Sequence, residues 1–150
     1  MQLSRKADYG LRLVLELAKV YPNGRVATHE IAKRQAIPEP FLAKIVAELA
    51  RSGLVVSKRG SGGGVFLARP PEEITLLDVI EALDGPIAFA PCRDNPYLCC
   101  WAGQCILEEV LKGATEVVEQ YLGGLTFADV LERARQRQRI PLMESFSGSR

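Results

Sequence analysis

The chain has 150 residues, 47% of them hydrophobic and 25% charged, which is ordinary for one globular domain or a small domain with an extension. Charged residues at Asp8, Arg12 and Glu16 interrupt the first apolar segment, so we expect no signal peptide. No apolar run approaches the ~20 residues that a membrane span needs. We therefore expect a cytoplasmic protein with no membrane partner.

The net charge of +1 conceals an uneven distribution. Residues 1–70 contain 12 Lys and Arg against 5 Asp and Glu, whereas residues 71–150 contain 7 against 13. A basic amino-terminal half favours contact with a polyanion, and the acidic half favours protein contacts. Chance segregation of solvated charge is the alternative.

Three helices are predicted first. Residues 4–20 have one apolar face, and Ser4 is placed to cap them. Thr28 is expected to cap a short second helix over residues 29–35. Pro38 and Pro40 fit the opening turn of a third helix that closes at Gly53. Two short helices joined by about three residues indicate a helix-turn-helix.

A β-hairpin is predicted next. Residues 54–59 and 65–69 are strand-like, and a glycine-rich run separates them. A helix-turn-helix followed by a hairpin is a winged helix, in which Lys58 and Arg59 can meet phosphate. The glycines do not form a nucleotide-binding loop, because no Lys-Ser/Thr pair follows. A simple flexible hairpin tip is the alternative.

Three further helices are expected. Thr75 and Asp78 resemble a capping box for residues 76–83. Residues 106–122 carry a broad apolar stripe that suits either a dimer seam or an intramolecular core: Leu107, Val110, Leu111, Ala114, Val117, Val118, Tyr121 and Leu122. Thr126 and Asp129 cap a last helix. The expected organisation is a DNA-binding region over 1–71, a cysteine-loop and dimerisation region over 72–135, and a flexible tail over 136–150.

All four cysteines fall within fourteen positions, at Cys92, Cys99, Cys100 and Cys105. The surrounding stretch contains proline and glycine, so a loop can bend several thiolates around one point. Thiolates are ligands of iron–sulfur clusters and of zinc. Structural zinc sites prefer two close Cys-x2–4-Cys pairs, and this loop offers only one such spacing, Cys100-x4-Cys105, so zinc is the less favoured metal. A cluster-free thiol switch at the adjacent Cys99 and Cys100 remains a third reading.

The segment RSGLVVSKRGSGGGVFLARPPEEITLLDVIEALDG, together with LSRKADYGLRLVLELA, resembles the Rrf family of winged-helix regulators, which includes IscR-like, NsrR-like and CymR-like proteins. The resemblance covers residues 1–135. It implies a mainly α fold with a small β-wing, a winged helix-turn-helix domain and a long dimerisation helix. Implied partners are a double-stranded DNA operator, a second copy of the chain and RNA polymerase.

The resemblance also implies a [4Fe–4S] or [2Fe–2S] cluster held by three cysteines in the loop before the long helix. Cys92, Cys99 and Cys105 fit that pattern, but one inserted residue makes Cys100 a rival to Cys99. IscR-like members place a histidine where this chain has Glu108. NsrR-like members share Asp8, which in that family reaches the cluster from the partner subunit. Asp8 is the favoured fourth ligand and Glu108 the alternate.

DNA contacts are expected from the third helix and the wing, with Lys44 reading bases and Arg59 holding the backbone. The residues assigned to the DNA interface are Thr28, Glu39, Ala43, Lys44, Lys58, Arg59, Gly60 and Ser61. No paired catalytic carboxylates and no Ser/His/Asp set are present, so no enzyme is expected. The predicted function is a cluster-dependent DNA-binding repressor that senses nitric oxide, redox state or iron–sulfur status. A cluster-free regulator of the CymR type, controlled by thiols or by a partner protein, is the alternative.

Overall fold

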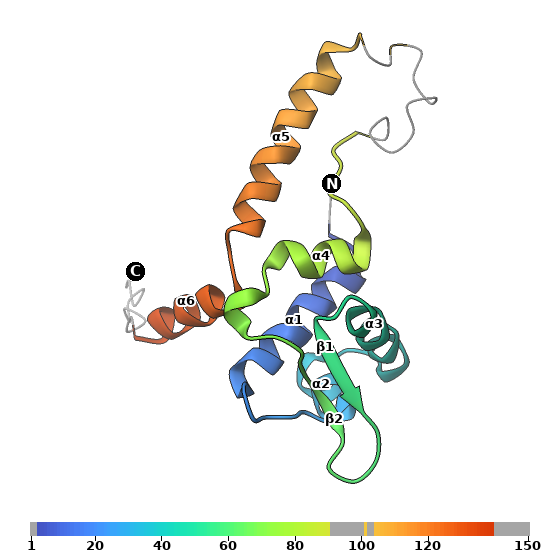
Figure 1. Cartoon of the computed structure of the whole chain (residues 1–150), viewed down its shortest axis with the longest axis vertical. Coiled ribbons are helices and arrows are strands. Elements are labelled where there is room, and N and C mark those ends of the chain that lie inside the picture. Colours follow the sequence, from blue (N-terminus) through green and yellow to red (C-terminus); the bar gives the residue numbers. More distant parts are fainter. Residues whose placement is uncertain (1–2, 91–100, 102–103, 140–150) are drawn as a thin grey trace, which may run out of the picture.

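The structure, a computed structural model, describes residues 3–90, 101 and 104–139. These residues form six α-helices, one short 3₁₀ helix and a two-stranded antiparallel sheet (Figure 1). The helices α1 to α4 and the hairpin lie together, and α5 leads away from them as one long rod (Figure 1). The mainly α fold with a small β-wing is therefore confirmed.

Helix α1 (Arg5–Val20) lies at the centre of this group. The Ser4 hydroxyl accepts a hydrogen bond from the Ala7 amide at 3.0 Å, which satisfies one free donor of the first turn and confirms the predicted cap. Leu13, Val14 and Leu17 are at most 1% exposed and form the middle of the core. Helices α3, α4 and α6 all pack against α1, so this helix connects the two halves of the chain.

Helix α2 (Thr28–Gln35) begins differently from the prediction. Its N-cap is Ala27, whose carbonyl accepts from the amides of Glu30 and Ile31 at 3.0 and 3.2 Å. The preceding Val26 pairs with Val65 of the hairpin, so extended backbone ends at Ala27 and Thr28 is already helical. The expected Thr28 cap is therefore wrong, since no side chain caps this helix.

Helix α3 (Glu39–Arg51) starts after Pro38 with Pro40 in its first turn, as expected. The wing that follows consists of β1 (Val55–Lys58) and β2 (Gly64–Leu67), paired from Val55↔Leu67 to Lys58↔Gly64. Alternate residues of this hairpin, including Val55, Val65 and Leu67, are buried against the helices. Val26 forms an isolated antiparallel bridge with Val65, so one residue from the segment before α2 also pairs with β2.

The 3₁₀ helix η1 (Pro71–Glu73) leads to α4 (Leu76–Asp84). The predicted capping box is present: the Asp78 amide donates to the Thr75 hydroxyl at 3.1 Å, and the Thr75 amide donates to the Asp78 carboxylate at 2.8 Å. Helix α4 packs so closely on α1 that a Cβ at Gly10 would lie 2.2 Å from Leu83 Cδ1. A side chain at position 10 would therefore force the Leu83 side chain to move.

Helix α5 (Ile106–Gly123) is followed by α6 (Phe127–Arg139). Thr126 and Asp129 form the predicted capping box at the start of α6. Phe127 is 2% exposed and belongs to the same apolar cluster as Leu13 of α1. Helix α6 runs to Arg139, and the rest of the predicted tail lies outside the described residues.

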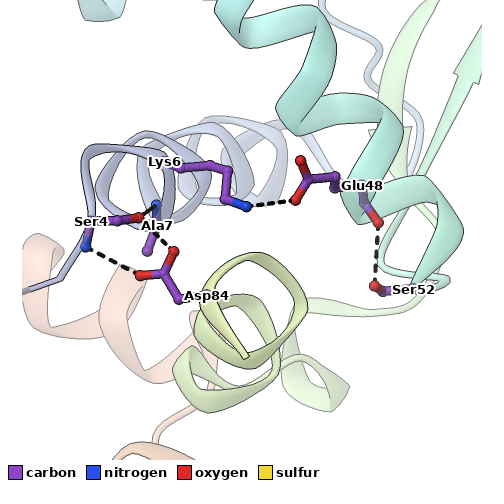
Figure 2. Close-up of polar contacts among 6 residues, drawn as sticks. All are labelled: Ser4, Lys6, Ala7, Glu48, Ser52 and Asp84. Carbon is purple, nitrogen blue, oxygen red and sulfur yellow. Dashed lines mark hydrogen bonds and ion pairs between the residues drawn. The ribbon is translucent and has the colours of Figure 1, made fainter. Parts of the chain in front are cut away.

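Three polar contacts join the start of α1 to α4 and α3 (Figure 2). The Ser4 amide and hydroxyl both donate to the Asp84 carboxylate, with distances of 3.1 and 2.5 Å. Lys6 forms an ion pair with Glu48 of α3 at 2.9 Å. The first turn of α1 is thus fixed to the end of α4, from which the cysteine loop departs, and to α3.

Candidate nucleic-acid interface and cysteine site

The turn between α2 and α3 is defined by backbone geometry. Ala36 adopts a left-handed conformation with φ 52°, and the Ile37 amide reaches back to the Ala32 carbonyl at 2.9 Å. Ile37 is 3% exposed and packs into the core, and this contact fixes the chain where it leaves α2. This short connection sets the angle at which α3 presents its outer face.

Helix α3 divides into an inner and an outer face. Leu42, Ile45 and Leu49 are fully buried. Glu39, Ala43 and Lys44, the three α3 residues assigned to DNA, are all exposed. The structure therefore leaves these side chains accessible to a duplex, while Thr28 at the start of α2 is only half-exposed.

The wing tip carries the other four assigned residues, Lys58, Arg59, Gly60 and Ser61, and all are exposed. A tight turn closes it, with the Gly63 amide donating to the Gly60 carbonyl at 2.9 Å. A Cβ at Gly63 would lie 2.4 Å from the Lys58 carbonyl oxygen, so glycine is required there. The glycine run thus folds the tip into a defined turn.

Arg25, which the sequence did not single out, lies against this wing. Its Nη1 donates to the Gly62 carbonyl at 2.7 Å, and its guanidinium carbon lies 5.5 Å from the centre of the Phe66 ring. Lys58 Nζ lies 5.7 Å from the same ring. No sequence spacing links Arg25 to Phe66, since the contact depends on the Val26–Val65 bridge.

Some of the described cations have an ion-pair partner and others do not. Lys6, Lys19 and Arg34 each pair with a carboxylate. The ion pairs seen within the described part of the chain include none from the exposed cations of α3 and the wing: Arg25, Lys44, Lys58 and Arg59. Unpaired cations on one face raise the local positive potential and favour an anionic partner.

Of the four cysteines, only Cys105 lies within the described residues. It is half-buried, has a free thiol and occupies the N-cap position of α5. An open depression of about 460 Å³ surrounds it, lined also by Glu108 and Lys112. Cys92, Cys99 and Cys100 lie outside the described residues, so the predicted set of cysteine ligands is not tested.

The carboxylates assigned to the cluster lie on different helices. Asp8 is on α1, where it pairs with Arg12 at 2.9 Å and keeps 45% of its side chain exposed. Glu108 is in the first turn of α5 and lines the depression beside Cys105. Among the described residues no three His, Cys, Asp or Glu side chains gather as a metal site. Asp8 does not line the Cys105 depression within one chain. The thiol and carboxylate that do line it are donors that suit iron.

A protein-family model for Rrf2, described as an iron-dependent transcriptional regulator, matches residues 3–133. The chain belongs to the Rrf2 family. It is 42% identical over 133 residues to Rv1287 of Mycobacterium tuberculosis (strain ATCC 25618 / H37Rv), named as an HTH-type transcriptional regulator, covering 87% of this chain and 81% of the relative. It is 34% identical over 139 residues to protein aau3 of Rhizobium meliloti (strain 1021), covering 91% and 88%.

Two solved structures are similar over most of their length. T. potens IscR has a TM-score of 0.75 and 32% identity, with 92% of this chain and 91% of that chain covered. CymR (YrzC), the global cysteine regulator of B. subtilis, has a TM-score of 0.69 and 28% identity, with 89% and 98% covered. This chain is therefore similar both to an IscR protein and to a CymR protein.

These findings confirm the resemblance drawn from the wing sequence. The chain is a winged-helix, DNA-binding transcriptional regulator and not an enzyme. Members of this family bind DNA and are typically dimeric. Within the described residues, no helix is long and apolar enough to cross a membrane.

Proposed function

We propose that this Rrf2-family chain is a homodimeric repressor whose affinity for a DNA operator depends on an iron–sulfur cluster bound by the cysteine loop. The observation that carries the proposal is the position of Cys105. Its thiol is free and stands at the first turn of α5, the helix whose outer stripe suits a dimer seam. A ligand at this point lies beside the proposed dimer seam, and the cysteine loop joins this point to the end of α4 along the chain.

The ligand set we propose is Cys92, Cys99 and Cys105 from one chain and Asp8 from the partner subunit, with Cys100 and Glu108 as alternates. Three thiolates and a carboxylate leave one iron with a weaker ligand. When bound, the cluster supplies iron that reacts with nitric oxide or oxygen, which suits a sensor of these molecules or of iron–sulfur status. The proposal applies to a [4Fe–4S] and to a [2Fe–2S] cluster alike.

A route from the cysteine loop to the DNA-binding face supports this coupling. The loop leaves α4 just after Asp84, which binds both the amide and the hydroxyl of Ser4. Ser4 caps α1, and the neighbouring Lys6 pairs with Glu48 of α3. A shift of the loop on loss of the cluster would therefore move the first turn of α1 and, through it, α3 (Figure 2).

Anaerobic purification tests the proposal directly. We expect a coloured dimer with bound iron and sulfide that retards operator DNA, and a large change in operator affinity once the cluster is removed by chelation. A colourless protein that binds DNA equally well before and after chelation would contradict the cluster but leave the DNA-binding regulator intact.

Cysteine substitutions test the ligand set. Cys92→Ala and Cys105→Ala should abolish the visible absorbance and change operator affinity, because neither thiol has a substitute beside it. Cys100→Ala should keep much of the absorbance, and Asp8→Ala should give a labile cluster. Should Cys100→Ala be colourless while Cys99→Ala stays coloured, the assignment is wrong by one residue.

The alternative is a cluster-free regulator of the CymR type, controlled by thiol oxidation or by a partner protein. The similarity to the B. subtilis CymR structure is the observation that favours it. A colourless protein whose DNA affinity changes on mild oxidation, and recovers with a dithiol reductant, would select this reading.

A further inference from the structure

Arg25 belongs to the segment between α1 and α2, yet its side chain lies against the wing. It precedes Val26, whose amide and carbonyl both bond to Val65 of β2, at 3.0 and 2.9 Å. Val65 and Val26 are buried, so the neighbouring residues Arg25 and Phe66 lie on the outer face of this small sheet. Arg25 is exposed.

Strand β2 lies between its two neighbours, with β1 on one side and the Val26 segment on the other. Phe66 therefore receives one cation from each neighbour, Lys58 at 5.7 Å and Arg25 at 5.5 Å from the ring centre. Attraction between a cation and an aromatic face holds both side chains over the ring. The ring thus compensates for the repulsion between two like charges that no described carboxylate neutralises.

The guanidinium is also fixed in direction. One of its nitrogens donates to the Gly62 carbonyl at 2.7 Å, beside the wing tip. A guanidinium carries five N–H donors in a planar fork and matches phosphate in a bidentate manner. Because Arg25 is ordered before any ligand arrives, less side-chain freedom is lost when phosphate binds.

We propose that Arg25 is a phosphate-binding residue of the DNA interface, held in place by Phe66 and Gly62 so that it extends the cationic surface of Lys58 and Arg59. This inference rests on the DNA-binding function of this Rrf2-family chain and assigns it a further contact. The occupant is the sugar-phosphate backbone beside the wing, so the contact strengthens binding without reading sequence.

The test compares charge-removing and charge-keeping variants of the full-length dimer on two duplexes of equal length, one selected from a random pool and one arbitrary. Arg25→Gln keeps a donor for the Gly62 carbonyl but loses the charge, and Arg25→Lys keeps the charge. Arg137→Gln, an exposed position on α6, is the matched control for a loss of one positive charge. Thermal melting confirms that each variant is folded.

Removing one phosphate contact from each subunit should lower the slope of log affinity against log salt by about 1.8 in magnitude. At about 0.15 M salt this corresponds to roughly 30-fold weaker binding, and the difference from wild type should shrink as salt rises towards 1 M. Arg25→Lys should keep a slope near that of wild type, and Arg137→Gln should change nothing. The loss should be similar on both duplexes.

An unchanged slope for Arg25→Gln would overturn the inference, whether or not affinity falls. So would a slope that falls equally in Arg25→Lys. A weakening that is constant at all salt concentrations would assign Arg25 to wing support alone. Wild-type protein that binds neither duplex would instead contradict DNA binding itself, and an Arg59→Ala variant with the expected salt dependence shows that the wing is engaged.

Discussion

The exposed stripe on α5 predicts a quantitative effect of charge on dimerisation. Five large apolar side chains of this helix are each 60–69% exposed: Ile106, Leu107, Val110, Val117 and Tyr121. Complete burial of such a side chain contributes about 1.5–3 kcal/mol, so covering the exposed two-thirds contributes about 1–2 kcal/mol. Ten side chains from two copies give roughly 10–20 kcal/mol, which can exceed an association cost of about 4–15 kcal/mol.

Val117→Glu introduces a carboxylate into this stripe in both copies. Each buried, unpaired ion loses several kcal/mol of hydration, so a loss of about 4 kcal/mol or more is expected, or at least ~10³-fold weaker dimerisation. Sedimentation equilibrium over a concentration series measures this change. Lys112→Gln, which alters the net charge equally on the opposite side of α5, should leave the dimer intact.

A Val117→Glu protein with the dimerisation constant of wild type would refute the assignment of α5 as the seam. If that variant proves insoluble, the milder Val117→Ser keeps the question open to measurement. It should weaken the dimer by a smaller but resolvable factor, because it removes apolar burial without adding a charge.

Two further predictions concern stability. Phe127→Ala should destabilise the fold by about 3–5 kcal/mol in chemical denaturation, because the ring is 2% exposed and would leave a cavity beside α1. Hydrogen bonds from the Thr126 amide and hydroxyl lower the pKa of Asp129 below its ordinary value of 3.8. Its ionised form therefore stabilises the fold above pH 3.8, and this contribution is lost as pH falls through the lowered pKa. Asp129→Asn should lower the melting temperature at pH 7 and have little effect in strong acid; equal effects at both would contradict the cap.

Local chemistry explains which parts of the fold the sequence predicted. The capping pairs Thr75–Asp78 and Thr126–Asp129 involve residues three apart, and the structure shows both. The Thr28 cap failed because a pairing between distant residues, Val26 with Val65, determines where extended backbone ends. Arg25 was missed for the same reason, as its partner ring lies on another strand.

The same contrast between local patterns and long-range contacts applies to the functional site. Exposure of Lys44 and Arg59 followed from helical and hairpin patterns in the sequence. The apolar stripe of α5 suited a dimer seam and an inner core equally well, because periodicity records which side is apolar and not what covers it. The exposure of Val110 and Tyr121 in the single chain now favours a partner. The ligand choice between Cys99 and Cys100 stays a prediction.

The burial of Phe127 has a consequence for building hybrid regulators. A fragment that ends near residue 71 would lose α4 and Phe127. Both belong to the same apolar cluster as Leu13, Val14 and Leu17 of α1, so part of that cluster would become exposed. Sensor modules therefore cannot be exchanged by joining chains at the end of the wing. Suitable junctions lie after Gly85 and before Thr126, at the two ends of the segment that contains the cysteine loop and α5. With these junctions, η1, α4 and Phe127 all come from the same parent protein as the DNA-binding face.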